Sequence, residues 1–355
     1  MSREELRQGV RAALASIMDP RSGRDIVAAG MVTDVEVDDA GNVRLAFVLK
    51  PDDPPQLPRE ARRAVQAVSG VVSAKVDVRA APGDAPATTP KAVPAPTPRQ
   101  FPHLGTVLAI SSGKGGVGKS TVSVNLAAAL AAQGFKVGLM DADIYGPNLP
   151  RMLGVIGQEP VISPARRILP LEAHGLKVMS VGSLIERDVA TIWRGPIITK
   201  IITQFLGDVD WGQLDYFLVD LPPGTGDAQL SLVQSVNVAA GVIVTTPQEV
   251  AVGDALRGAK MFEKVNVPLL GIVENMSYFQ CAHCGERTHI FAAGGGRRLA
   301  EELGAPLLGE IPLQEIVQEL AEQGQPVVLA APQSPAGQAL LAMADRVVSA
   351  LKARG

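Results

Sequence analysis

Cysteine is nearly absent from this chain of 355 residues: it has two, Cys281 and Cys284, too few for a framework of structural disulfides. There is no basic excess, because 33 Lys and Arg residues face 36 Asp and Glu residues, and the composition therefore does not favour a nucleic-acid partner. No uninterrupted apolar stretch reaches the roughly eighteen residues that span a bilayer, and the charged start, Met1-Ser-Arg-Glu-Glu-Leu-Arg, lacks the apolar segment of a secretory signal. With 46% hydrophobic residues, the sequence predicts a globular, cytoplasmic protein without a membrane partner.

A glycine-rich loop is the most informative feature that is present. Residues 113–120 read Gly-Lys-Gly-Gly-Val-Gly-Lys-Ser and match the phosphate-binding pattern G-x-x-x-x-G-K-[ST]. In such a loop, backbone N–H groups converge on the phosphates past glycines without a Cβ, the lysine neutralises the β- and γ-phosphates, and the serine ligates Mg²⁺. A buried-strand pattern at Thr106–Ile110 precedes the loop and a helix pattern at Val122–Ala132 follows it, as the site requires. The predicted nucleotide contacts are Gly113, Lys114, Gly115, Gly116, Val117, Gly118, Lys119, Ser120 and Thr121.

Beyond the loop, apolar runs alternate with helix-like segments. The runs that indicate buried strands are Lys136–Met140, Leu176–Val181, Tyr216–Leu221, Gly241–Thr245 and Pro268–Val273. This alternation predicts an α/β domain over residues 103–355, a P-loop NTPase with a mainly parallel, doubly wound sheet. Ligands of such sheets bind at the carboxyl ends of the strands, which is where the loop lies.

A small module precedes this domain. Residues 1–79 predict an α+β unit with helices at Arg3–Ile17 and Leu57–Ala67 and strands at Gly30–Val37, Asn42–Leu49 and Val71–Val78. Residues 80–102, rich in Ala, Pro and Thr, predict a semi-rigid linker. The module resembles the small domain of iron–sulfur and metal-centre maturation proteins. Pro51-Asp-Asp-Pro-Pro stands where that domain often carries a cysteine, so we assign the module no thiol chemistry and expect it to dock partners.

The two cysteines are separated by two residues, which is the spacing of a metal or redox site. Two thiolates cannot complete a four-sulfur site for [4Fe–4S] or for tetrahedral Zn²⁺, whereas a two-fold dimer supplies a second pair. One cluster bridging a homodimer is therefore the leading hypothesis. Three alternatives stay open: a zinc knuckle within one chain that adds His283 and His289, a redox dithiol, and a pair of inert thiols.

Three carboxylates stand at predicted strand ends near the loop. Asp141 and Asp143 follow the strand that ends at Met140, and Asp220 begins Asp220-Leu-Pro-Pro-Gly-Thr-Gly-Asp227 at the end of another strand. Hydrolysis of a phosphoanhydride needs such groups to hold Mg²⁺ and to direct water. The sequence thus places candidate acids and the phosphate loop at one edge of the sheet.

Lys114, the second residue of the loop, is the feature by which the loop resembles the deviant Walker A class of dimeric ATPases. The resemblance implies a face-to-face dimer in which Lys114 reaches the nucleotide of the other subunit. It also implies that Asp143 orients or deprotonates the attacking water, that Asp220 holds the Mg²⁺ shell with Ser120, and that Asp141 supports both.

The same resemblance implies three further contacts. Gly224 supplies a backbone N–H to the γ-phosphate and acts as a switch hinge. Asn275 and Pro312 occupy the positions of adenine contacts, which favours ATP over GTP.

Several motifs together resemble the Mrp/ApbC family of P-loop iron–sulfur cluster carriers, relatives of MinD and of the nitrogenase iron protein. They are the deviant loop, Asp141-Ala-Asp-Ile-Tyr-Gly-Pro-Asn, Trp193-Arg-Gly-Pro196, Asp220-Leu-Pro-Pro-Gly-Thr-Gly-Asp, Glu274-Asn-Met-Ser and Cys281-x-x-Cys284, within about residues 101–355. The resemblance implies an ATP hydrolase that holds a [4Fe–4S] cluster at Cys281 and Cys284, receives it from cluster donors and delivers it to apo iron–sulfur proteins.

Two rival functions share the phosphate loop. A positioning ATPase of the MinD or ParA kind needs a membrane or DNA surface, but the helix-like segment Gly337–Lys352 is not strongly basic and indicates a packing helix. A reductase like the nitrogenase iron protein keeps its cluster and takes its two ligands per subunit from separate parts of the chain. The adjacent cysteines here favour a releasable cluster.

Overall fold

The structure is a computed structural model that describes residues 3–19, 22–38, 40–49, 57–80, 100–143, 146–181, 195–224, 226–281 and 283–354. The chain divides into two compact units, Met1–Lys91 and Ala92–Gly355. Most of the predicted linker at 80–102 lies outside the described residues, as do the Pro51-Asp-Asp-Pro-Pro stretch and Trp193-Arg. The predicted domain boundaries therefore stay predictions.

The first unit is a small α+β fold. Its elements are α1 (Arg3–Ala15), β1 (Val32–Val37), β2 (Asn42–Leu49), α2 (Leu57–Gln66) and β3 (Ser73–Ala80). The three strands form one sheet in the order β1-β2-β3, with β1 antiparallel and β3 parallel to β2. Its core is built by Leu14, Ile26 and Phe47, which are fully buried. All five elements coincide with predicted ones to within two residues at each end.

The second unit alternates strands and helices. Its strands are β4 (Thr106–Ser112), β5 (Val137–Asp141), β6 (Val161–Ile162), β7 (Ile168–Leu169), β8 (Leu171–Ala173), β9 (Leu176–Ser180), β10 (Tyr216–Asp220), β11 (Ala240–Thr245), β12 (Leu269–Gln280), β13 (Arg287–Thr288) and β14 (Leu307–Leu313). Its helices are η1 (Pro102–Leu104), α3 (Lys119–Ala132), α4 (Leu149–Met152), α5 (Gly195–Asp208), α6 (Asp227–Ser235), α7 (Glu249–Lys264), α8 (Gly295–Leu303), α9 (Glu315–Glu322), α10 (Val327–Ala330) and α11 (Pro335–Lys352).

Nine of these strands form the central sheet, in the order β13-β12-β11-β4-β10-β5-β9-β8, with β14 also paired to β12. The ladders from β9 through β5, β10, β4, β11 and β12 to β14 are all parallel, and only β8 and β13 pair antiparallel. The prediction of a mainly parallel, doubly wound α/β sheet is confirmed. Such a sheet brings the carboxyl ends of β4, β5 and β10 together at one edge.

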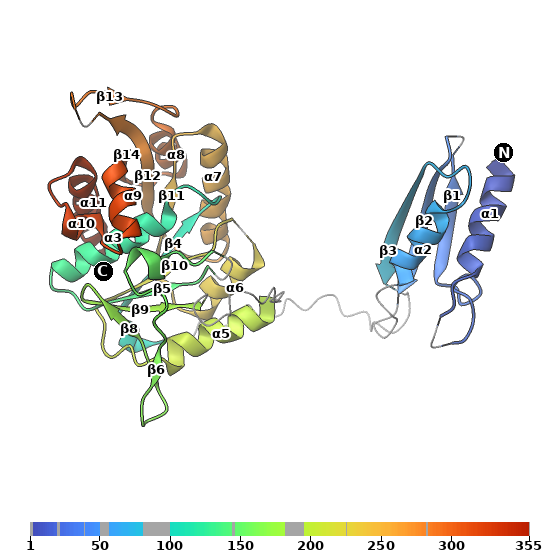
Figure 1. Cartoon of the computed structure of the whole chain (residues 1–355), viewed down its shortest axis with the longest axis horizontal. Helices are drawn as coiled ribbons and strands as arrows, with labels where there is room; N and C mark the ends of the chain where they lie inside the picture. The colour runs from blue at the N-terminus through green and yellow to red at the C-terminus, as the bar shows by residue number, and fades with distance from the viewer. Residues whose placement is uncertain are drawn as a thin grey trace. The chain divides into compact units, whose positions relative to one another are not determined.

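Helices cover both faces of this sheet (Figure 1). Successive residues of β4 alternate between the faces: Leu108 and Ile110 join a core with α3, α10 and α11, whereas Val107 and Ala109 join one with α5, α6, α7 and α8. Because both faces are covered, the strands carry nearly continuous apolar runs, and these runs made them visible in the sequence. Within the described residues, no helix is long and apolar enough to cross a membrane.

Two predicted boundaries are wrong in ways that matter for the site. The helix after the phosphate loop begins at Lys119, three residues before the predicted start at Val122. The strand predicted to end at Val273 runs on to Gln280. Its outer half, which starts with Glu274 and Asn275, lacks an apolar run, and it forms because β14 and β13 supply backbone partners.

Candidate functional site

The phosphate loop connects β4 to α3 at the centre of the sheet edge. Gly116 and Gly118 have φ values of 81° and 79°, a region that side chains with a Cβ rarely adopt. A Cβ added at Gly113 would lie 2.0 Å from the backbone carbon of Asp254, so the loop is packed directly against α7. The first turn of α3 follows at once, and its N–H groups face the loop.

Three side chains of this helix turn converge on Asp220, the last residue of β10. The Lys119 ammonium lies 2.6 Å from Asp220 Oδ2, and Ser120 Oγ donates to the same oxygen at 2.7 Å. Ser123 Oγ donates to Asp220 Oδ1 at 2.6 Å. Lys119 is 6% exposed and Asp220 is fully buried, so the ion pair is shielded from water. The cluster unites the predicted phosphate lysine with both predicted Mg²⁺ ligands.

A second buried carboxylate, Asp141, stands beside this cluster. It is the register partner of Asp220 in the β5–β10 ladder and is fully buried. Burial, and after it the negative charge of Asp220, raises the pKa of Asp141 to about 7, although the backbone N–H of Asp143 donates to Oδ1 at 3.0 Å. Asp141 thus ties the carboxyl end of β5 to the loop that carries Asp143.

Asp143 lies at the mouth of the loop. With Lys114, Gly115 and Lys119 it lines a cavity of about 230 Å³, and its Oδ1 accepts the N–H of Gly146 at 3.1 Å. The lining also includes Ser120 and Thr121. The cavity therefore gathers the predicted phosphate contacts and the predicted water-directing acid.

Two other predicted contacts are engaged within the chain. The N–H of Gly224, expected to meet the γ-phosphate, donates to the Ser112 carbonyl at 3.0 Å, with Gly224 at a φ of 97°. Lys114 Nζ lies 3.5 Å from Gln248 Oε1 at the start of α7. No carboxylate within the described residues pairs with Lys114.

The predicted adenine contacts line a neighbouring, more apolar cavity of about 440 Å³. Asn275 and Pro312 lie in its wall, and Thr121 and Met152 line both cavities, so the two are adjacent. Asn275 Nδ2 donates to the Val117 carbonyl at 2.9 Å, which fixes β12 to the phosphate loop. The sequence placed both residues near the nucleotide but did not reveal this contact.

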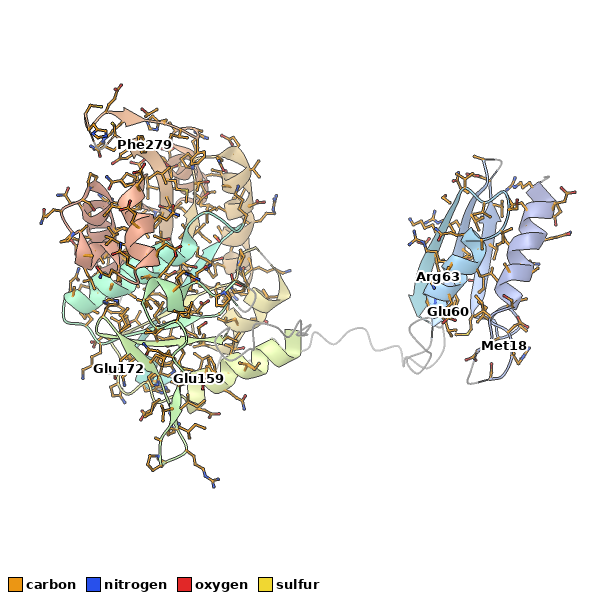
Figure 2. The ribbon with its side chains drawn as sticks, in the orientation of Figure 1. Met18, Glu60, Arg63, Glu159, Glu172 and Phe279 are labelled. Atoms are coloured by element: carbon orange, nitrogen blue, oxygen red, sulfur yellow. The ribbon has the colours of Figure 1, made fainter. Side chains whose placement is uncertain are left out.

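The cysteines lie at the far end of the same strand. Cys281 follows β12 directly, and its N–H donates to the Glu286 carbonyl while the Gly285 N–H donates to the Cys281 carbonyl, both at 2.9 Å. The pair therefore sits in the turn of the β12–β13 hairpin, near Phe279 (Figure 2). N–H groups of Cys284 and then His283, directed at the Cys281 sulfur, lower its pKa. Cys284 is exposed and Cys281 half-buried, and neither forms a disulfide.

The histidines near the pair do not complete a metal site with it. His289 Nδ1 lies 3.2 Å from the Ser277 carbonyl. Among the residues that the structure describes, no three His, Cys, Asp or Glu side chains are grouped so that they could hold a metal ion. In this part of the chain, Cys281 and Cys284 thus lie without a third grouped ligand.

Sequence reasoning missed Glu274 as a structural anchor of β12. Its buried carboxylate accepts the Ser277 hydroxyl and the Gly296 N–H at the start of α8. The available signal was an acid directly after the apolar run that ends at Val273. A buried carboxylate is stable only with hydrogen-bond partners. Ser123 was missed as well, although three residues after Ser120 it falls on the same helix face.

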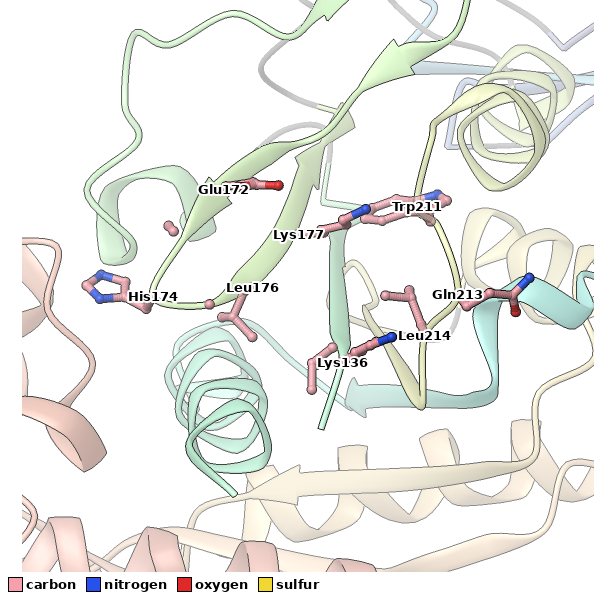
Figure 3. A pocket seen from close by; sticks show the side chains of 11 residues that line it. Lys136, Glu172, His174, Leu176, Lys177, Trp211, Gln213 and Leu214 are labelled. Carbon is pink, nitrogen blue, oxygen red and sulfur yellow. The ribbon is translucent and has the colours of Figure 1, made fainter. Parts of the chain in front are cut away.

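A further cavity, of about 510 Å³, lies elsewhere on the sheet (Figure 3). Its lining includes Val137 and Leu176, the first residues of β5 and β9, together with Lys136, Lys177 and Trp211. It therefore lies at the amino ends of these strands, opposite the phosphate loop. None of the predicted site residues lines it.

Comparison with known proteins identifies the family. A family model described as the NUBPL iron-transfer P-loop NTPase matches residues 103–348, more than half of the chain. The chain belongs to this family. A second model, described as an iron–sulfur cluster assembly protein, matches residues 7–78.

Relatives of this iron-transfer NTPase chain carry consistent names. The iron–sulfur cluster carrier proteins of Synechocystis and Deinococcus radiodurans are each 44% identical to it, over 95% and 96% of this chain and 96% and 95% of their own length. The iron–sulfur cluster transfer protein NUBPL of Mus musculus is 49% identical over 72% of this chain and 81% of its own.

Solved structures agree on the fold. A nucleotide-binding protein of Archaeoglobus fulgidus in complex with ADP is 41% identical, with a TM-score of 0.56 over 62% of this chain and 87% of its own. MinD of Pyrococcus horikoshii, complexed with Mg-ADP, is 22% identical, with a TM-score of 0.52 over 68% of this chain and 96% of its own, and supports the fold alone. The predicted recognition of an iron–sulfur P-loop ATPase family is confirmed.

Proposed function

We propose that this chain is an ATP-dependent carrier that binds a [4Fe–4S] cluster between the cysteine pairs of two subunits and transfers it to apo-proteins. The observation that carries this proposal is the exposed Cys-x-x-Cys turn at the end of the strand that borders the nucleotide cavities. No other cysteine exists in the sequence to complete a four-sulfur site. The names of the carrier relatives support the same reading.

In the ATPase half of this function, each residue has a defined task. Lys119 carries the positive charge for the β- and γ-phosphates, and its present pairing with Asp220 keeps it beside them. The oxygens of Ser120 and Asp220, 2.7 Å apart, suit Mg²⁺, a metal that neutralises phosphate charge when bound. Asp143 orients or deprotonates the attacking water, and Asp141 holds the Asp143 loop through its N–H.

The proposed dimer completes both sites. Lys114, held by a neutral glutamine, reaches the nucleotide of the opposite subunit and stabilises charge on the transferred phosphoryl group. The same two-fold axis brings the second Cys281 and Cys284, and four thiolates then ligate one cluster. Gly224 exchanges its bond to Ser112 for the γ-phosphate, which makes it the switch hinge.

The cluster is cargo in this proposal. Donor proteins load it and apo iron–sulfur proteins receive it, in the cytoplasm, where thiols stay reduced. The exposure of Cys284 supports release, since an incoming thiolate of the recipient can reach it. The module at residues 1–79, of which residues 7–78 match the iron–sulfur cluster assembly model, is proposed to dock these partners.

Anaerobic reconstitution tests the carrier function directly. Wild-type protein incubated with iron and sulfide is expected to hold about four irons and four sulfides per dimer, and Cys284→Ser is expected to hold none. His289→Asn serves as the matched control, because it changes a polar residue of the same hairpin and should leave cluster content unchanged. Stoichiometric zinc in each monomer, lost in His289→Asn, would support the zinc knuckle instead.

A further inference from the structure

The cavity that holds the predicted adenine contacts is also walled by the cysteine hairpin. Phe279 precedes Cys281 by two residues and Ile290 follows Cys284 by six, and both line the cavity with Asn275 and Pro312. Ile290 is 54% exposed, so its apolar surface faces solvent at the cavity rim. A nucleoside in this cavity therefore touches the segment that carries the thiols.

Hydrogen bonds join Phe279 and Cys281 within the β12–β13 hairpin. Phe279 pairs with Thr288, and Gln280 pairs with Arg287, across the β12–β13 ladder. The Cys281 N–H closes the turn onto Glu286. A displacement of Phe279 therefore changes the position of Cys281 as well, and Ile290 follows the end of β13 by two residues.

The hairpin joins the rest of β12 through an irregular stretch. The β12–β14 ladder passes from Asn275 opposite Ile311 to Phe279 opposite Leu313, so β12 has two extra residues there. Met276, inside this bulge, has a φ of 54°. Asn275, just before the bulge, is fixed to the phosphate loop through Val117. The bulge thus separates a strand segment anchored at the phosphate loop from the hairpin that carries Phe279 and Cys281.

We propose that the nucleoside of bound ATP packs against Phe279 and Ile290 and so fixes the orientation of the cysteine hairpin. Phe279 and Ile290 are positioning residues: through them, base occupancy sets how firmly Cys281 and Cys284 hold the cluster. The inference rests on the proposed carrier function and adds to it the route by which nucleotide reaches the thiols.

This route differs from one that runs through the phosphates, and ligands separate the two. The magnesium complex of the β,γ-imido analogue of ATP fills both cavities without hydrolysis. Magnesium tripolyphosphate fills only the phosphate cavity. Saturation by each ligand is established first by displacement of a fluorescent nucleotide.

The test measures the rate of iron loss from cluster-loaded protein to a ferrous chelator under anaerobic conditions. In the wild type, the imido analogue is expected to slow iron loss by about fivefold or more, while tripolyphosphate leaves the rate within about twofold of that without ligand. Phe279→Ala and Ile290→Ala are expected to reduce the effect of the analogue to below about twofold. The matched control is Ile162→Ala, since Ile162 is an isoleucine of β6 that is 68% exposed and lies outside the cavity lining.

Both wall residues are partly exposed, so the variants are expected to fold, and their thermal unfolding is recorded beside the wild type. Equal slowing by tripolyphosphate, no slowing by the analogue in the wild type, or full slowing in both alanine variants would each overturn the inference. If wild-type protein holds no cluster after anaerobic reconstitution with iron and sulfide, the carrier function itself is contradicted. The inference then falls as well.

Discussion

Asp141 and Asp220 lie side by side at the ends of adjacent strands, and among the described residues Asp220 forms an ion pair, with Lys119, whereas Asp141 forms none. Lys119, Ser120 and Ser123 all contact the Asp220 carboxylate, so each oxygen of this buried acid has a partner. Asp141 has weaker partners, with its Oδ2 3.4 Å from both the Leu149 nitrogen and the Ser180 hydroxyl. The Lys119 charge acts on Asp141 as well, but burial and the negative charge of Asp220 outweigh it and raise the pKa of Asp141.

The raised pKa of Asp141 gives a pH-dependent stability with a defined sign. The folded protein keeps a proton on Asp141 up to about pH 7, whereas the unfolded chain releases it near the ordinary aspartate pKa of 3.8. The free energy by which protonated Asp141 favours the folded state is therefore fully present below the unfolded pKa. It is lost as the pH rises to the folded pKa. Asp141→Asn removes this loss and keeps an oxygen for the Asp143 N–H. From pH 5 to pH 8, the unfolding free energy of Asp141→Asn is expected to rise relative to that of nucleotide-free wild type by on the order of 2 kcal/mol. The Tm of the variant is expected to rise relative to wild type accordingly.

Calorimetry or thermal fluorescence at both pH values measures this difference. Asp345→Asn provides the control, since its carboxylate is exposed on α11 and its Tm should follow the wild type at each pH. A gap between Asp141→Asn and wild type that stays constant from pH 5 to pH 8 would show that Asp141 has an ordinary pKa.

At the scale of elements, two glycines at the contact between the phosphate loop and α7 differ in how closely they are packed. A Cβ at Gly113 meets the α7 backbone, whereas a Cβ at Gly253, within α7, meets nothing within 4 Å. Gly113→Ala is expected to lower the unfolding free energy by about 1–3 kcal/mol and to weaken nucleotide binding, because the loop or the helix must shift. Gly253→Ala, the matched control, is expected to raise it by about 0.5–1 kcal/mol, since alanine suits a helix interior better.

Thermal unfolding and nucleotide titration of the two variants give the comparison. Equal Tm values for Gly113→Ala and wild type would mean that the loop does not press on α7. A lower Tm for Gly253→Ala would mean that this part of α7 has a neighbour that the described residues do not include.

The same scale explains which elements the sequence predicted. The buried strands β4, β5, β9, β10 and β11 carry continuous apolar runs, and their prediction needed only local pattern. The outer half of β12 forms because β14, more than thirty positions further along the chain, supplies backbone partners, and the short β13 forms by pairing with the end of β12. The bulge at Met276 has the same origin, and with it the cavity wall at Phe279.

At the scale of the whole molecule, the proposed dimer predicts that two inactive variants restore each other. If Lys114 acts on the opposite subunit, a mixed dimer of Lys114→Ala and Asp143→Asn chains contains one site with both residues intact. An equimolar mixture is then expected to recover about a quarter of wild-type ATPase activity, because half of the dimers are mixed and each has one working site. Steady-state phosphate release from the separate and mixed variants measures this recovery. Without any recovery on mixing, Lys114 would act on the nucleotide of its own chain.

The sequence by itself determined the phosphate loop, the buried strands and the spacing of the cysteine pair, because each depends on residues close together in the chain. The tertiary structure alone decided that Asp141 faces Asp220, that Asn275 bonds to the loop and that Phe279 and Ile290 line the same cavity as Asn275 and Pro312. The Asp141–Asp220 and Asn275–Val117 contacts depend on strand order and register, which bring together residues more than seventy positions apart. Local sequence preferences determine each helix and strand. The burial of the apolar strand faces in one sheet determines which strands pair and in which register.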